Sequence, residues 1–440
     1  MPYYHPNFDV RKKFCEVYLP EPAEEVYDIV DRFHEVVDDV IMPLRRDLDG
    51  GFGHDQALAD VAIAKAMQAV YDFGWPMAIL PEELGGPGGV MDSTVTYAML
   101  IEELGRADAG IALDVSLLYW FYSPIKFAGR MDLLEKFGQP LLDGKHHRAT
   151  MSLTEPAGGT NIDDTTQHGR TIRTIAKLEG DEWVINGQKI WPSGASRSDI
   201  GYMTLCTTDP NLGEDGIKFI VVPADAEGLT FGKPIDTFGM CCTDTNTEIF
   251  YDNVRVPVEY AVTWGTDVRD ANLFKELAVE DKITTPGYVN GCVQTCIEIL
   301  LDFSRDRLIA GKPMREHSVF VHALGGILTQ WTTCRAAYME VCYQFDHPEK
   351  YGMPWERFIY SKAAAVDQVT MMGVRQSLQT IMDLMGSYGS APEYHVEKYM
   401  RDVKQAELWL GGRFRTQMDV MLDYYDYEWA GPKWEPSSKR

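Results

Sequence analysis

The spacing of apolar residues divides the chain into three parts, and the first part has the period of a helix. Before residue 148, apolar positions recur every three or four residues, which is typical of helices buried along one face. The pattern predicts helices over 24–44, 57–73, 92–104 and 109–127. The last of these has no polar face, so we expect it to be buried.

From Ala149 the period shortens to two. Five short runs rich in β-branched and aromatic residues are separated by Gly, Asp and Asn turns, which predicts an antiparallel barrel or sandwich. After Val268 the helical period returns and predicts helices over 287–306, 314–345, 355–386 and 395–423. The "TTPG" sequence at 284–287 contains a proline, and it predicts an interruption before the first of these helices.

This order of elements predicts an α+β multidomain fold. The expected parts are an N-terminal helical domain (1–147), a middle β-domain (148–265), a C-terminal four-helix bundle (266–425) and a tail (426–440). At 440 residues the chain is long enough for such a division.

Charge and hydropathy exclude two classes of binding partner. The chain has 66 acidic and 41 basic residues, and its formal net charge of −25 repels phosphate backbones and anionic membranes. No apolar run reaches the length of a membrane span, and the first residues lack a secretory signal. We therefore expect a cytoplasmic protein that binds neither nucleic acid nor membrane.

The cysteines do not have the spacing of a metal site. Cys241 and Cys242 are adjacent, but the eight cysteines include no Cys-x-x-Cys pair and no partners at zinc-ligand spacing. The expectation is therefore reduced thiols and no structural metal.

Six ordered motifs resemble those of the acyl-CoA dehydrogenase family. They are "WPMAILPEELGG", "LTEPAGGTN", "VINGQKIWPSGASRSD", "FGMCCTDTNTEIFYDNVRVP", "RDRLIAGKPMREH" and "EYHVEKYMRDVK". The resemblance covers roughly residues 20–424. It implies the acyl-CoA dehydrogenase fold, FAD as cofactor, an acyl-CoA substrate, an electron-transfer flavoprotein as acceptor and a homotetramer.

The residues of these motifs suit a flavin. An isoalloxazine ring needs an aromatic or apolar wall and hydrogen-bond donors at its polar edge. The Thr154 hydroxyl and the backbone at Leu153 and Thr154 can supply donors, Trp191 can stack, and the Ser193 hydroxyl can approach the reactive nitrogen. The resemblance implies the same roles for them.

The resemblance also extends the cofactor site beyond these four residues. It places Gly159 and Thr160 at the cofactor. It also implies that Arg307, whose guanidinium suits a phosphate, binds the pyrophosphate of the cofactor in a neighbouring subunit. Asp383 stands where the family has a Gln, just before Gly386.

The usual catalytic base is missing. Most of the family carries a Glu eight residues beyond the Asp of its last motif, and counting from Asp402 reaches Leu410, between Trp409 and Gly411. A leucine cannot accept a proton, so another carboxylate must do so. The first candidate is Asp114, the sole charge in an apolar helix, and the second is Asp281.

Each candidate base has an ordinary alternative role. Asp114 resembles the base of relatives that oxidise alicyclic rings, but it could instead be the partner of a nearby Arg or Lys. Asp281 aligns with the base position of other relatives, ahead of Lys282, but it could instead belong to a solvated acidic face.

The substrate is expected to be compact. Tyr119 and Tyr122 suit a rigid ring, and the resemblance adds Asp244, Thr245, Lys282, Trp409, Leu410 and Gly411 to the substrate site. The prediction is an FAD-dependent acyl-CoA dehydrogenase acting on an alicyclic or carboxylated, ring-derived thioester. A flavoenzyme of the same fold with monooxygenase or non-redox lyase chemistry, or a non-catalytic flavin- or CoA-binding subunit, remains an alternative.

Overall fold

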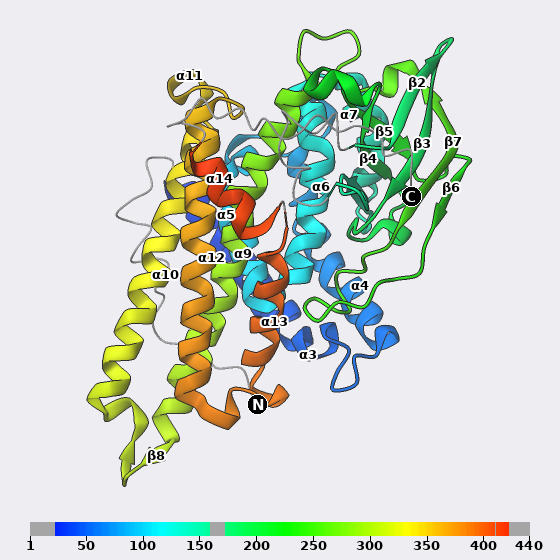
Figure 1. Cartoon of the computed structure of the whole chain (residues 1–440). Coiled ribbons are helices and arrows are strands. Elements are labelled where there is room, and N and C mark those ends of the chain that lie inside the picture. The colour runs from blue at the N-terminus through cyan, green and yellow to red at the C-terminus, as the bar shows by residue number, and fades with distance from the viewer. Residues whose placement is uncertain (1–22, 159–171, 410, 422–440) are drawn as a thin grey trace, which may run out of the picture.

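A computed structural model describes residues 23–158, 172–409 and 411–421, and the chain runs from helices to a sheet and back to helices (Figure 1). This is the predicted fold class. The helices before the sheet are α2 (Ala23–Val36), α3 (Arg45–Leu48), α4 (Gln56–Asp72), α5 (Thr94–Ala107), α6 (Ala109–Phe127) and α7 (Met131–Gly138).

Side-chain caps fix the starts of the two central N-terminal helices. Ser93 Oγ accepts a hydrogen bond of 3.1 Å from Thr96 N at the start of α5. Asp108 Oδ1 accepts bonds from Gly110 N at 2.8 Å and Ile111 N at 3.0 Å at the start of α6. Such caps satisfy N–H groups that have no partner within the helix. As expected from its sequence, α6 is buried along nearly its whole length.

The predicted helix over 24–44 is helical throughout, but it is not a regular α-helix beyond Val36. After α2 the chain passes through a wider turn over Val37–Ile41 and a tighter one over Met42–Leu44, which contains Pro43. Because proline has no backbone N–H to donate, it is compatible with the start of a new turn rather than with a continuing helix.

Seven strands of the described residues form one mixed sheet. They are β1 (Ala149–Ser152), β2 (Ile175–Glu179), β3 (Glu182–Lys189), β4 (Gly201–Thr207), β5 (Ile217–Pro223), β6 (Leu229–Phe231) and β7 (Ile249–Pro257). Their order is β1-β4-β2-β3-β7-β6, with β5 also on β4. The sequence predicted antiparallel pairing throughout, whereas β1 pairs with β4 in parallel, Ala149 opposite Gly201. The long connection through β2 and β3 allows this, because parallel neighbours need a crossover.

The chain ends in a helical bundle. Its helices are α9 (Asp270–Asp306), α10 (Ser318–Phe345), α11 (Pro348–Tyr351), α12 (Arg357–Met385), α13 (Val396–Ala406) and α14 (Gly412–Val420). A small hairpin of β8 (Leu308–Ile309) and β9 (Lys312–Pro313) joins α9 to α10. Within the described ranges, no helix combines the length and apolar character that a membrane span requires.

The predicted interruption at 284–287 is wrong, because α9 continues through Pro286. A proline inside a helix costs a hydrogen bond to the carbonyl four residues earlier. Here α9 packs against α5, α6, α10 and α12, and this burial holds the segment helical. Tertiary packing therefore outweighs the local cost, and α9 begins seventeen residues before the predicted start at 287.

Glycines bring α5 and α9 close together. A methyl group on Gly105 would lie 2.1 Å from Tyr288 O, and one on Gly291 would lie 2.1 Å from Glu102 O. Beside this contact, Arg335 Nε on α10 lies 2.7 Å from Glu102 Oε2, and both side chains are buried. The N-terminal and C-terminal helices therefore share one core at α9.

Candidate active site

A cavity of about 1000 Å³ lies where the N-terminal helices, the sheet and the C-terminal bundle meet. Leu117 and Trp120 on α6 and Leu277 on α9 contribute apolar walls. Its other lining residues are Met151, Leu153, Thr154, Ile190, Trp191, Pro192, Ser193, Asp236, Thr237, Phe238, Asn246, Asp281, Arg375, Lys404, Gln405, Glu407, Leu408, Trp409, Gly411, Gly412, Arg413 and Phe414. The cavity is large enough for a sizeable organic ligand.

Four predicted cofactor residues line this cavity together. Leu153 and Thr154 follow β1, whereas Trp191 and Ser193 follow β3. Ile190 N donates a 2.9 Å hydrogen bond to Thr154 O, which fixes the two segments side by side. Trp191 has a φ of 71°, a conformation that costs energy for a residue other than glycine. Its indole is 47% exposed.

A buried ion pair, which the sequence analysis did not assign, joins these two segments. Lys189 Nζ lies 2.8 Å from Glu155 Oε1 and donates to Leu153 O at 2.8 Å. Burial alone would raise the pKa of Glu155, but Lys189 and hydrogen bonds from Thr174 leave it below its ordinary value. The pair therefore holds the backbone that carries Thr154 and Trp191. Both residues stand inside the quoted motifs, which is the signal that could have identified them.

The 244–246 segment reaches the cavity through Asn246 rather than through Asp244 or Thr245. Asn246 Nδ2 donates a 2.8 Å bond to Asp244 Oδ2, and Thr245 O accepts one of 3.1 Å from Gly194 N. Burial raises the pKa of Asp244 to about 6, opposed by hydrogen bonds from Ser193 and Asn246. These two predicted substrate residues are therefore supports for the 193–194 turn.

Asp281 is the buried carboxylate of α9 that lines the cavity. Thr285 Oγ1, one turn later, donates a 2.8 Å hydrogen bond to Asp281 Oδ1. Burial raises the pKa of Asp281 to about 7, although Lys282 and Thr285 lower it. Such a carboxyl group exchanges protons near neutral pH, as a general base requires. The neighbouring Lys282 points elsewhere and donates to Thr416 Oγ1 at 3.1 Å.

Asp114, the first candidate, occupies a different environment. Arg148 Nε lies 3.0 Å from both carboxylate oxygens, and Arg148 Nη2 lies 2.6 Å from Oδ2. His146 Nε2 lies 3.3 Å from the same oxygen. Burial would raise the pKa of Asp114, but Arg148 and His146 hold it well below its usual range. Asp114 is not among the described lining residues, and its geometry is that of a structural ion pair.

Tyr119 and Tyr122 lie in the core instead of at the cavity. Trp75 Nε1 donates to Tyr119 Oη at 3.1 Å, and the Tyr119 ring stacks on Tyr97 with centroids 4.1 Å apart. Tyr122 Oη donates to Phe137 O at 2.5 Å. This corrects their predicted place in the substrate site, because the helical period turns Leu117 and Trp120 of α6 toward the cavity instead.

The segment expected to carry the usual base reaches the cavity. Trp409 and Gly411 line it, and the Trp409 ring meets the Trp120 ring edge-on with centroids 6.3 Å apart. Leu410, Gly159 and Thr160 lie outside the described residues.

Arg307, Asp383 and Gly386 form a separate group. Arg307 ends α9 and Gly386 ends α12, at the end of the bundle that carries β8 (Figure 1). The Arg307 guanidinium lies 5.3 Å from the centre of the Tyr388 ring, so the two segments are neighbours. All three residues are exposed, and none lines the cavity.

Sequence reasoning identified Asp281 but missed the other charged residues of the lining. Arg375 Nη1 lies 3.1 Å from Glu407 Oε1, and Lys404 Nζ lies 2.8 Å from Glu407 Oε2. Arg413 also lines the cavity. Lys404 ends a quoted motif, but no local signal groups it with Arg375 and Glu407, because α12 and the end of α13 meet only in the folded bundle.

Three family models match successive parts of the chain. They describe the N-terminal domain of acyl-CoA dehydrogenases (residues 23–145), the middle domain (150–254) and the C-terminal domain (282–421).

Two curated relatives are named for ring substrates. The chain is 24% identical to cyclohexane-1-carbonyl-CoA dehydrogenase of Syntrophus aciditrophicus (strain SB), over 93% of this chain and 99% of the relative. It is 27% identical to cyclohex-1-ene-1-carbonyl-CoA dehydrogenase of Geobacter metallireducens, over 75% of this chain and 82% of the relative.

A solved structure shares the fold. The butyryl-CoA dehydrogenase of Megasphaera elsdenii superposes with a TM-score of 0.77 at 23% identity, over 92% of this chain and 98% of that one.

Proposed function

This chain belongs to the acyl-CoA dehydrogenase family, and we propose that it oxidises a compact, ring-derived acyl-CoA with FAD as cofactor and Asp281 as base. The observation that carries the proposal is the position of Asp281. It is a buried carboxylate with a pKa near 7, and it lines the same cavity as Thr154, Trp191 and Ser193.

The residues around Trp191 fit a flavin. The half-exposed indole offers a flat wall, and Thr154 and Ser193 offer hydroxyl donors beside it. Trp191 keeps an unfavourable backbone conformation here, as functional sites often do. When bound, FAD supplies the acceptor for the hydride that leaves the substrate.

Asp281 removes the proton from the substrate carbon. Its Oδ1 accepts the hydrogen bond from Thr285, so Oδ2 is the oxygen that takes the proton. Burial keeps water from competing and keeps the carboxylate basic near neutral pH. Asp114 instead holds the side chain of Arg148, the residue directly before β1.

The shape and lining of the cavity favour a compact acyl group. Leu117, Trp120, Leu277 and Trp409 give it apolar and aromatic walls, and aromatic side chains offer large, rigid contact surfaces. The names of the two curated relatives support an alicyclic carbonyl-CoA as the substrate class.

The functional unit is a homotetramer that passes electrons to an electron-transfer flavoprotein. The exposed group of Arg307, Asp383 and Gly386, which does not line the cavity, suits the cofactor of a neighbouring subunit. Apolar side chains on the β8–β9 hairpin and on α10 are exposed: Leu308, Ile309, Val319 and Val321. Their exposure supports contact with another subunit.

The test is an anaerobic titration of the purified protein with FAD bound. Cyclohexane-1-carbonyl-CoA, cyclohex-1-ene-1-carbonyl-CoA, butyryl-CoA and a long-chain acyl-CoA are added in turn while flavin absorbance is followed. We expect a ring thioester to bleach the flavin and to lose two hydrogens, measured by mass spectrometry. Absence of bleaching by every thioester, or oxygen-dependent hydroxylation of the substrate, would contradict the proposal.

A further inference from the structure

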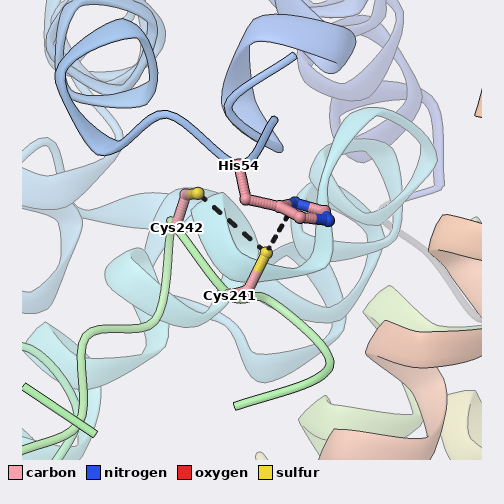
Figure 2. Close-up of side chains that lie close together, drawn as sticks. All are labelled: His54, Cys241 and Cys242. Carbon is pink, nitrogen blue, oxygen red and sulfur yellow. Dashed lines mark hydrogen bonds between the residues drawn. The ribbon is translucent and has the colours of Figure 1, made fainter. Parts of the chain in front are cut away.

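Outside the cavity, three residues with metal-ligating side chains converge from two distant loops (Figure 2). A ring nitrogen of His54 and the Sγ atoms of Cys241 and Cys242 all lie within 4.8 Å of one another. Cys241 Sγ is 3.3 Å from His54 Nδ1 and 3.9 Å from Cys242 Sγ. Both cysteines are free thiols.

The two separations from Cys241 Sγ are close to the edges of a tetrahedral zinc site. With Zn–S bonds of about 2.3 Å and Zn–N bonds of about 2.0–2.1 Å, ligand atoms lie roughly 3.3–3.8 Å apart. Thiolate and imidazole together are a ligand set that zinc prefers.

Asp49 offers an oxygen for the fourth position. Its Oδ1 lies 3.3 Å from Cys241 Sγ and 3.8 Å from His54 Nδ1. Arg401 contacts both carboxylate oxygens, with Nη2 2.7 Å from Oδ2 and Nη1 at the longer distance of 3.3 Å from Oδ1, and this contact orients the carboxylate. His54 Nδ1 is also 3.0 Å from Asp49 O, a hydrogen bond that a bound metal would replace.

Both loops are held in place independently of a metal. In the first loop, Gly50 has a φ of 71°, and a methyl group there would lie 2.5 Å from Asp55 N. Only glycine suits this turn, which folds the chain back so that His54 returns beside Asp49. The second loop is tied by Gln56 Nε2, which donates to Cys242 O at 3.0 Å, and by Met240 N, which donates to Asp402 Oδ1 at 2.7 Å.

We propose that His54, Cys241 and Cys242 bind a zinc ion, with Asp49 as the fourth ligand. The sequence analysis expected no structural metal, because no close Cys pair with zinc-ligand spacing is present. The ligands instead come from positions 187 residues apart that meet only in the fold.

The site is structural rather than catalytic. Four protein ligands leave no open position for substrate. The ion would join the loop before α4 to the loop that continues into Asp244 and Asn246, and Asn246 lines the cavity. Bound zinc would thus stabilise one wall of the cavity without entering it, and the inference does not depend on the proposed reaction.

The test uses the full-length protein, purified without chelator and then incubated with Zn²⁺ alone and dialysed. We expect one zinc per chain by elemental analysis. Zinc K-edge X-ray absorption, which a bound flavin does not obscure, should show two sulfur neighbours at about 2.3 Å and two nitrogen or oxygen neighbours.

Matched variants distinguish this site from adventitious binding. His54→Ala and Cys241→Ser should each lower zinc content at least tenfold after dialysis, whereas His322→Ala and Cys334→Ser should retain it. The His54 side chain is half exposed, so its variant is expected to fold even if the cysteine variant does not. Retention of zinc in His54→Ala, a sulfur-free coordination shell, or a Cys241–Cys242 disulfide in the native protein would overturn the proposal.

Discussion

Arg148 donates hydrogen bonds to Asp114 through two nitrogens. Its Nε lies 3.0 Å from both carboxylate oxygens, and its Nη2 lies 2.6 Å from Oδ2. A carboxylate held in this way is stabilised in its charged form and is a poor proton acceptor. Asp281 has the opposite environment, since burial raises its pKa to about 7 and Thr285 occupies only one of its oxygens. The contrast between these two aspartates is the basis for the proposed base.

The first prediction concerns pH. Because the raised pKa of Asp281 is about 7, the carboxylate form should predominate above that pH and decline below it. The rate of anaerobic flavin reduction should therefore reach a plateau above about pH 8 and fall roughly tenfold per pH unit well below 7. Rapid-mixing spectroscopy with saturating substrate measures this profile.

Other buried carboxyl groups titrate close to the same range and must be distinguished from Asp281. Burial raises the pKa of Asp244, Asp367 and Asp402 to about 6 and that of Glu280 to about 8, but none of these four lines the cavity. Asp367→Asn should keep the profile. A rate that rises as the pH falls would contradict the assignment of a base.

The second prediction concerns the ion pair between Glu155 and Lys189. Lys189→Met removes the charge and the bond to Leu153 O, leaving Glu155 buried without its partner. Breaking a buried pair in this way costs about 3–5 kcal/mol. We expect a lower melting temperature and at least tenfold weaker FAD binding, measured by fluorescence titration. Lys177→Met, at an exposed position of β2, is the control and should leave both unchanged.

The third prediction concerns Trp191. Trp191→Ala removes the flat wall and should weaken FAD binding at least tenfold, while the melting temperature of the FAD-free protein stays nearly constant, because the indole is 47% exposed. Trp264→Ala is the matched control, since Trp264 is 48% exposed and is not a lining residue. Equal FAD affinity in both variants would refute the role of Trp191.

The fourth prediction concerns the contact between α5 and α9. Gly105→Ala places a methyl group 2.1 Å from Tyr288 O, and overpacking of this kind costs about 1–3 kcal/mol. Urea unfolding should show the loss. The control is Gly325→Ala on α10, where nothing lies within 4 Å and the better helix propensity of alanine should stabilise the protein slightly.

Local sequence signals predicted the elements better than their interactions. Periodicity predicted α6 from 109 to 127, because its boundaries are set by Asp108 and by local chain preference. The same reasoning failed at Pro286, where the surrounding helices outweigh the local cost of the proline. Parallel pairing of β1 with β4 also depends on contacts between residues far apart in the chain.

In the candidate site, too, local sequence predicted single residues better than the contacts between residues far apart in the chain. Motifs identified Thr154, Trp191 and Ser193, which the fold brings together at one cavity. An isolated charge in an apolar helix suggested Asp114 as base, but the sequence could not reveal that Arg148 would be its partner. The group of His54, Cys241 and Cys242 had no sequence signal at all, because its two loops meet only in three dimensions.

The most direct test of the account compares anaerobic flavin reduction in Asp281→Asn with that in the double variant Asp114→Asn/Arg148→Gln, which removes both charges of the competing pair. With the ring thioester that reduces the parent enzyme, Asp281→Asn should slow reduction by about 10²–10⁴-fold while still binding FAD and substrate. The double variant should reduce at a rate within tenfold of the parent. Normal reduction in Asp281→Asn, with loss confined to the double variant, would contradict the assignment of Asp281 as the base.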